Sequence, residues 1–344
     1  MLLLSLLLFL SFLFDLSFAF TLDEESACRS GESILTHERR IINGPPPLEM
    51  PLDLQWAYTR CGNIKMGDFY IDDSRGGKGT HYSHNRKDIE SRITASVREL
   101  RDARVAPAPK FIDAPLMTRV ARALVDPSVA QHLARHPNST AVVFGSNSPA
   151  VESLLLAAGF SLVLTVEYNN LTYDHPQLIT ARPLDVEAAW AASSSSATPA
   201  PENKYKYLTP GSFDFALSIS SFDHDGLGRY GDPLAPDGDI MSMITMARYL
   251  KDDGLALVAV PVGIDVVWWN VMREYGPVRL PLLISEAQWR VVERIGWVET
   301  RFGKERDLKR GTGRPWEPVF ILEKKTLIPT TTTPAAVKEE EKEL

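Results

Sequence analysis

The second half of the chain alternates between short apolar runs and amphipathic segments. Four runs have the length and composition of buried strands: TAVVFG at 140–145, SLVLTVEYN at 161–169, FDFALSIS at 213–220 and LALVAVPVG at 255–263. Between them, residues 148–160 and 238–254 carry apolar side chains at helical spacing. Strands and helices in alternation predict a parallel sheet covered by helices on both faces.

The last elements of the pattern are expected to close this sheet. We expect a helix over 284–295, a strand over 296–302 and a final strand over 318–324. The last two strands are joined without room for a crossover helix, so they predict an antiparallel pair. Such a closing pair is typical of class I methyltransferases. The expected fold is therefore α/β: a doubly wound, mainly parallel, Rossmann-like seven-stranded sheet of that type, with an N-terminal helical extension.

Apolar periodicity with arginines on the opposite face predicts two or three further helices in residues 88–136. The chain is predicted to begin with a signal peptide or signal anchor at 1–19 and a stem at 20–51. An N-terminal extension with helices follows at 52–136. The α/β domain is expected at 137–326, with an insertion at about 191–204, and a disordered tail at 327–344.

The first twenty residues favour the secretory pathway, either the ER or Golgi lumen or secretion. Their apolar run, followed by small residues, predicts cleavage after Ala19, and only an uncleaved segment would bring the protein to a membrane. Cys28 and Cys61 are candidates for one disulfide, and Asn138 and Asn170 match the glycosylation pattern. The formal net charge of -7, with no basic block, argues against nucleic acid as a partner.

A cofactor site is predicted where the first strands of the sheet end. Gly145, Ser146 and Asn147 form the turn after the first strand, and Glu167 ends the second, at a spacing suited to binding the ribose of an adenosine. Ser220, at the end of the fourth strand, is expected to contribute as well. A dinucleotide fingerprint has three glycines where this turn has one, so S-adenosylmethionine, which has no phosphate, is the expected cofactor.

Four longer segments resemble one particular protein family. The segments are VVFGSNSPAVESLLLAAGF at 142–160, VEYN at 166–169, SISSFDHDGLGRYGDPL at 218–234 and VPVGIDVVWWNVMREYGPVRLPLL at 260–283. Together they resemble the uncharacterised domain family first catalogued from Caenorhabditis, over roughly residues 50–325. The resemblance implies a methyltransferase-like fold with no established reaction and no assigned catalytic residues.

The acidic loop after the fourth strand, residues 220–239, leaves the sheet where chemistry is expected. His224 is the candidate base, with Asp223 and Asp225 as catalytic partners, and a structural histidine is the alternative. The loop's aspartates permit a divalent metal, but we do not favour one, because Asp237 and Asp239 read as the start of the next helix. The candidate substrate-binding residues are Arg229, Tyr230, Trp268, Asn270 and Arg273.

These features lead to one main hypothesis and two alternatives. The main one is a secretory-pathway O-methyltransferase-like protein that uses S-adenosylmethionine on a glycan or small-molecule hydroxyl. The first alternative is a non-catalytic lumenal protein of the same fold that binds carbohydrate or protein. The second is a metal-dependent glycosyltransferase, for which Asp223-His224-Asp225 spells an acidic motif.

Overall fold

The computed structural model describes residues 39–42, 44–75, 79–107, 111–186, 209–285, 288–304 and 316–325. The predictions for the signal segment, the Cys28–Cys61 disulfide, the insertion at 191–204 and the tail at 327–344 therefore lie outside the described residues. Within the described part of the chain, no helix has the length and apolar character needed to span a bilayer.

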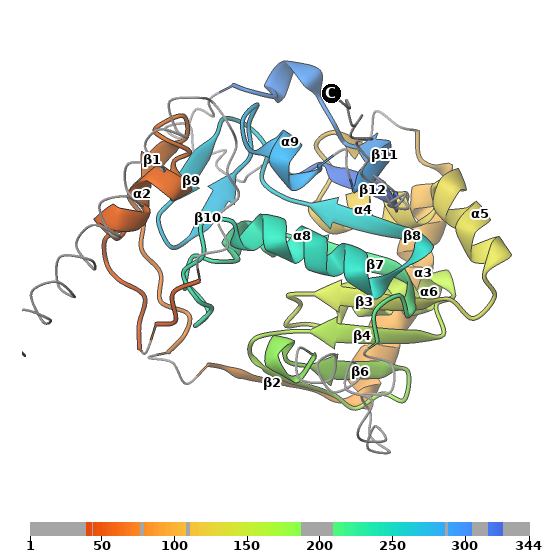
Figure 1. The fold of residues 1–344 in the computed structure, drawn as a ribbon. Coiled ribbons are helices and arrows are strands. Elements are labelled where there is room, and N and C mark those ends of the chain that lie inside the picture. The colour runs from red at the N-terminus through yellow and green to blue at the C-terminus, as the bar shows by residue number, and fades with distance from the viewer. Residues whose placement is uncertain are drawn as a thin grey trace, which may run out of the picture.

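A seven-stranded sheet forms the centre of the molecule (Figure 1). Its strands lie in the order β11 (Trp289–Ile295), β12 (Val319–Lys324), β8 (Leu250–Ala259), β7 (Phe213–Ile219), β3 (Thr140–Phe144), β4 (Leu162–Val166) and β6 (Leu178–Ala181). The five strands from β8 to β6 are parallel, whereas β12 is antiparallel to both β8 and β11. The chain thus steps outward from β3 in both directions, which is the doubly wound arrangement, and an antiparallel pair closes one edge. The predicted fold class is confirmed.

Helices cover both faces of this sheet. On β3, Ala141 and Val143 face the core beneath α3 (Arg86–Val105), α4 (Leu116–Leu124), α5 (Pro127–Arg135) and α6 (Ala150–Ala158). Val142 and Phe144 face the core beneath α8 (Gly238–Tyr249) and α9 (Leu280–Leu283). Successive side chains of a strand point to opposite faces, so a strand buried on both sides reads as a continuous apolar run. This is why β3, β4, β7 and β8 were recognisable in the sequence.

Two predictions at the C-terminal end were wrong. Residues 289–295 form the strand β11 rather than a helix, and the expected strand at 296–302 contains the short 3-10 turn η4 (Glu299–Arg301). A bulge between Val291 and Glu293 shifts the register of β11 against β12. Because of this shift, Val291 faces one core and Ile295 the other, and the apolar positions imitate helical spacing. The antiparallel closing pair itself is present.

Other short elements carried too little sequence signal to be predicted. β5 (Asn170–Tyr173) pairs in parallel with β2 (His81–His84) beside the main sheet. The helix α8 was predicted, but it ends at Tyr249, five residues before its predicted end. A separate three-stranded sheet joins β1 (Lys65–Gly67) to the hairpin β9 (Val266–Trp268) and β10 (Met272–Glu274).

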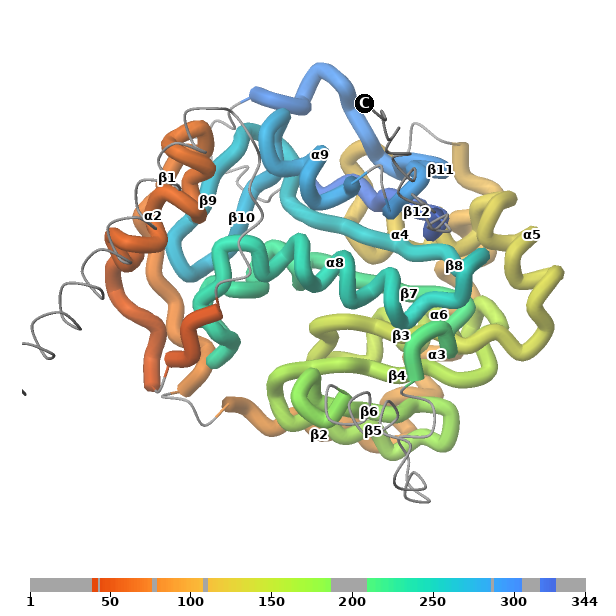
Figure 2. Tube along the Cα trace, viewed as in Figure 1, coloured from red at the N-terminus to blue at the C-terminus, as the bar shows by residue number. Residues whose placement is uncertain are grey.

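The N-terminal part of the chain packs against this hairpin, as Figure 2 shows at the left of the molecule. The helix α2 (Leu52–Tyr58) shares a small apolar cluster with the acidic loop and the hairpin, through Leu54, Leu227, Leu234 and Val267. Residues 39–67 therefore lie close to the carboxyl edge of the main sheet. The predicted boundaries at residues 51, 136 and 326 stay predictions.

Candidate functional site

A cavity of about 280 Å³ opens at the carboxyl edge of the parallel strands. Its walls include Phe144 and Val166, the last residues of β3 and β4, together with Pro183 after β6, Phe222 after β7 and Tyr249 from α8. Ligands of doubly wound sheets bind outside the carboxyl ends of the strands, where the chain reverses its winding direction. The position and the largely apolar lining make this cavity the candidate ligand site.

Gly145 makes the turn that opens the cavity, as predicted for that position in the chain. Its φ of +69° is favourable only for glycine, and an added Cβ would lie 1.7 Å from the Ser221 Oγ. Its N–H donates to the Val166 carbonyl at 2.9 Å, which fixes the turn to the end of the neighbouring strand. Backbone in this turn therefore lies against the loop after β7 with no side chain between them.

Ser146 and Asn147 belong to the same turn, but the structure does not place them on the cavity lining. The Ser146 hydroxyl donates to the Ser148 carbonyl at 2.8 Å and to Glu152 Oε2 at 3.3 Å. The Asn147 carbonyl lies 3.0 Å from His84 Nε2. Their contacts hold the turn in position.

Glu152, on α6, was not predicted and lies under the turn. It is fully buried, and its Oε1 accepts hydrogen bonds from the hydroxyls of Thr165 at 2.8 Å and Tyr173 at 3.1 Å. Burial raises the pKa of Glu152, which favours the neutral carboxyl. The single acidic residue among the apolar residues of AVESLLLAA was the available sequence signal. Glu152 connects the turn at residues 145–147 to β4 and β5.

Glu167 follows β4 between two residues that line the cavity, Val166 and Tyr168. Its own carboxylate is buried and accepts hydrogen bonds from the N–H and the side-chain amide of Asn169, both at 2.9 Å. Burial raises the pKa of Glu167 despite these donors. Tyr168 was not predicted from the sequence: it is 41% exposed and lines the cavity.

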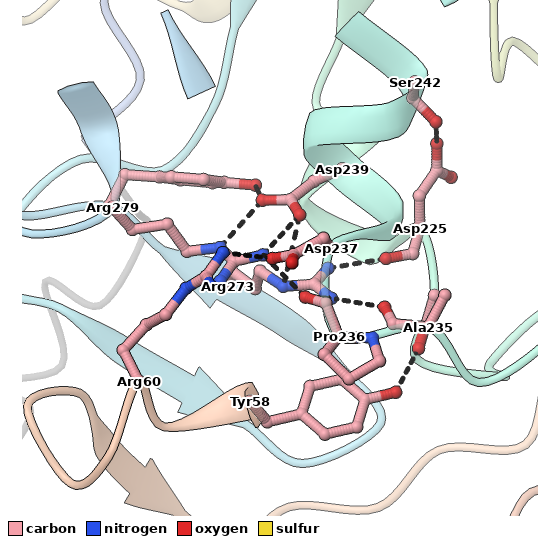
Figure 3. Close-up of polar contacts among 12 residues, drawn as sticks. Tyr58, Arg60, Asp225, Ala235, Pro236, Asp237, Asp239, Ser242, Arg273 and Arg279 are labelled. Carbon is pink, nitrogen blue, oxygen red and sulfur yellow. Dashed lines mark hydrogen bonds and ion pairs between the residues drawn. The ribbon is translucent and has the colours of Figure 1, made fainter. Parts of the chain in front are cut away.

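The acidic loop is held by a buried network of arginines and aspartates (Figure 3). Arg279 donates to Asp239 at 2.5 and 2.9 Å, and Arg60 pairs with Asp237. The Asp232 carboxylate instead accepts three main-chain N–H bonds within the loop, at 2.8 to 3.2 Å. Three of the five aspartates therefore hold the fold of the loop and the start of α8.

Arg273 belongs to this network as well, and the structure does not bring it to the cavity. Its guanidinium is fully buried and donates to the carbonyl of Asp225 at 2.6 Å. It also donates to the carbonyls of Ala235 and Pro236, at 3.3 and 3.2 Å. These contacts anchor the loop to β10.

His224 and Asp223 lie together on the short 3-10 helix η3 (Phe222–His224) that follows β7. His224 Nδ1 lies 2.5 Å from the Val271 carbonyl, which can only accept, so Nδ1 carries a proton. Asp223 Oδ2 lies 3.5 Å from His224 Nε2. Within the described residues neither Asp223 oxygen has a hydrogen-bond donor, although both are buried. Burial raises the pKa of Asp223.

Asp225 is the one candidate catalytic residue that lines the cavity. Its Oδ2 accepts the hydroxyl of Ser242, on α8, at 2.5 Å. Burial raises the pKa of Asp225 well above its ordinary value. Burial therefore favours the neutral form of this carboxyl group, which forms a hydrogen bond in a largely apolar wall.

The structure gathers Arg229 and Tyr230 next to His224. The Arg229 guanidinium lies 5.0 Å from the Tyr230 ring and donates to Asp73 at 2.7 Å, and the ring meets the His224 imidazole edge to face at 5.7 Å. Burial raises the pKa of Tyr230 to about 12. This group lies outside the cavity lining, on the side of the loop that faces residues 71–75.

The remaining candidates occupy structural positions. Asn270 turns the β9–β10 hairpin at φ +53° and exchanges hydrogen bonds with the main chain of Ile71 at 2.8 and 2.5 Å. The Trp268 ring packs on Gly67 so closely that an added Cβ would lie 2.3 Å from it. The Ser220 hydroxyl donates to Glu317 at 3.0 Å. None of the three lines the cavity.

Among the residues that the structure describes, no three histidine, cysteine, aspartate or glutamate side chains gather as metal ligands.

Residues 138–292 match the family described as "Caenorhabditis protein of unknown function, DUF268". The match contains the turn at residues 145–147, the acidic loop and the β9–β10 hairpin, so it confirms the resemblance found in the sequence. No curated protein matches the chain.

Solved structures with similar folds include several methyltransferases. The Burkholderia thailandensis 1,6-didemethyltoxoflavin-N1-methyltransferase, solved with S-adenosylhomocysteine, is 15% identical over 70% of this chain and 90% of its own, with a TM-score of 0.37. A putative sarcosine dimethylglycine methyltransferase from Galdieria sulphuraria is 12% identical over 61% and 87%, with a TM-score of 0.35. A putative RNA methyltransferase from Pyrococcus horikoshii is 9% identical over 67% and 98%, also at 0.35. At these scores the strand order, rather than the superposition, carries the fold assignment.

Proposed function

We propose that this protein is an S-adenosylmethionine-dependent methyltransferase of the secretory pathway that acts on a hydroxyl of a glycan or small molecule. The observation that carries the proposal is the cavity at the carboxyl edge of β3, β4, β6 and β7, in a sheet closed by an antiparallel pair. The fold alone does not specify a reaction, so the argument rests on the residues of the site.

The residues around the cavity suit an adenosyl cofactor. Gly145 lines the cavity, so a ligand there can approach its backbone without a side chain between them. Tyr168 also lines the cavity, as do Phe144 and Phe222, and an aromatic ring can stack on a purine. Glu167 is the carboxylate beside this surface, suited to ribose hydroxyls. The bound cofactor would supply an electrophilic methyl group.

His224 supplies the base that a hydroxyl acceptor requires. In the neutral imidazole Nδ1 donates to the Val271 carbonyl, and the lone pair on Nε2 can accept a proton. Asp223 Oδ2 lies 3.5 Å from Nε2, and a charged carboxylate there would stabilise the imidazolium that forms. Arg229 and Tyr230 border this group and are the proposed acceptor contacts.

Replacing His224 tests this assignment. The variant His224→Gln is expected to abolish methyl transfer to the acceptor while keeping the affinity for S-adenosylhomocysteine within about threefold. The matched control is His81→Gln, which removes an exposed imidazole on β2 that contacts Thr172 rather than the turn and should leave methyl transfer unchanged. Full turnover in His224→Gln would remove the proposed base and leave the cofactor assignment standing.

A non-catalytic protein that binds a ligand with the same fold is the second candidate. The observation that favours it is that predicted site residues form hydrogen bonds within the protein. Asn169 donates to the Glu167 carboxylate, and Arg229 donates to Asp73. Under this candidate, wild-type protein binds S-adenosylhomocysteine or a glycan but transfers no methyl group.

A further inference from the structure

The cavity is not built by the main sheet alone, because Arg39, on an arm formed by residues 39–42 and 44–50, is part of its wall. Arg40 and Leu234 form an antiparallel bridge, with main-chain hydrogen bonds of 2.8 and 2.9 Å in the two directions. The carbonyls of Pro46 and Pro47 accept bonds from the side chains of Tyr70 and Trp269. The arm is thus attached to the acidic loop and the hairpin at several points.

Alternation along this arm directs Arg39 and Arg40 to opposite sides. The Arg40 guanidinium pairs with Asp53 on α2 at 2.5 Å, and Ile42 packs against the apolar cluster that α2 belongs to. Successive side chains of an extended chain point in opposite directions. Arg39 therefore points away from α2, and it lines the cavity while remaining exposed to solvent.

Arg39 differs in charge from the other described residues that line the cavity. Among the described residues that line it, Arg39 is the only one with a cationic side chain. The carboxylates there are engaged within the protein: Asp237 pairs with Arg60, Asp232 accepts main-chain N–H groups, and Asp225 accepts the Ser242 hydroxyl. The walls at the ends of the strands are apolar and aromatic. The site therefore combines an apolar region with one exposed cation.

We infer that Arg39 binds the carboxylate of the ligand's amino-acid part, while the nucleoside occupies the apolar region. This inference rests on the proposed function. Guanidinium and carboxylate form charge-assisted, commonly bidentate hydrogen bonds. The arm then acts as part of the cofactor site, and it gives the site a preference for an adenosyl amino acid over a bare nucleoside.

The test compares two probes on the full chain by calorimetric titration. S-adenosylhomocysteine has the amino-acid part, whereas 5′-methylthioadenosine has the same nucleoside and thioether without it. The Arg39→Gln variant is expected to lower the affinity for S-adenosylhomocysteine about 10- to 100-fold, the range of one charge-assisted hydrogen bond. Its affinity for 5′-methylthioadenosine should stay within about twofold of wild type. Arg39→Lys should recover part of the loss.

Arg40→Gln is the matched control, because it removes the adjacent guanidinium on the opposite side of the arm and should preserve the ratio of the two affinities. An Arg39→Gln variant that weakens both probes equally, or neither, would overturn the inference while the cofactor assignment stands. Failure of the wild-type protein to bind either probe would instead overturn the proposed function.

Discussion

The buried pair of Asp239 and Arg279 gives a prediction about stability that can be worked out from the structure. Both side chains are at most 1% exposed, and two hydrogen bonds of 2.5 and 2.9 Å join them. In Asp239→Asn the shape is kept, but the buried guanidinium of Arg279 loses its nearest counter-ion and keeps the more distant Asp237, at 3.5 Å, which also pairs with Arg60. Removing one partner of a buried pair costs about 3–5 kcal/mol, because a charge remains without compensation.

The pKa of Asp239 gives a second value for the free energy that its ion pairs contribute to stability. Burial alone would raise the pKa of Asp239, but Arg273 and Arg279 outweigh it and lower the pKa to about 2. The fall from the ordinary value of 3.8 corresponds to roughly 2.5 kcal/mol. A lowered folded-state pKa means that this stabilisation is complete above pH 4 and is lost as the pH falls from 3.8 through 2.

Urea unfolding of the full chain measures both effects. At pH 7 the free energy of unfolding of Asp239→Asn should fall by about 3–5 kcal/mol, and the double variant Asp239→Asn with Arg279→Met should recover part of that loss. Asp53→Asn is the control, because its pair with Arg40 is largely exposed and should be worth at most about 1 kcal/mol. If the two aspartate variants lose equal stability, the reasoning about the buried network is wrong.

Two further predictions concern the cavity. Gly145→Ala should lower the free energy of unfolding by at least about 1–3 kcal/mol, because alanine is strained at a φ of +69° and its Cβ would collide with the Ser221 hydroxyl. Adding Ser221→Gly to this variant should recover only the part of the loss that comes from the collision. A variant as stable as wild type would refute this account of the turn. Because burial raises the pKa of Asp225, the wild type should lose more stability than Asp225→Asn as the pH rises above the ordinary value of 3.8. Melting temperatures at pH 4, 6 and 8 should show a growing advantage for Asp225→Asn, whereas a constant difference would contradict the assignment.

The sheet was predictable because its central strands are buried on both faces. β3, β4, β7 and β8 appear as apolar runs between turn residues, and each is followed by a helix or a loop at the same edge. β11 was mistaken for a helix because its bulge breaks the alternation of its side chains. β6, with four residues, gave no pattern long enough to recognise.

The place of the candidate site was predictable from the sequence, but its contacts were not. The residues after parallel strands meet at one edge, so Gly145, Glu167 and the acidic loop were expected to lie together. The partners of the loop aspartates come from distant parts of the chain: Arg60 lies 177 positions from Asp237, and Arg279 lies 40 from Asp239. No local pattern reports such pairs. The sequence separated Asp237 and Asp239, as the start of the next helix, from the catalytic candidates Asp223 and Asp225, but it gave no sign that Asp232 holds the loop together.

Tyr168 gives the most direct test of the central claim, that the cavity at the carboxyl edge of the sheet binds an adenosyl cofactor. The measurement is a calorimetric titration of the full chain with S-adenosylhomocysteine, accompanied by melting curves. We predict saturable one-to-one binding, a melting temperature that rises with ligand concentration, and an affinity that is lower in Tyr168→Ala but kept in Tyr168→Phe. No heat of binding and no shift in melting temperature at millimolar ligand would contradict the account.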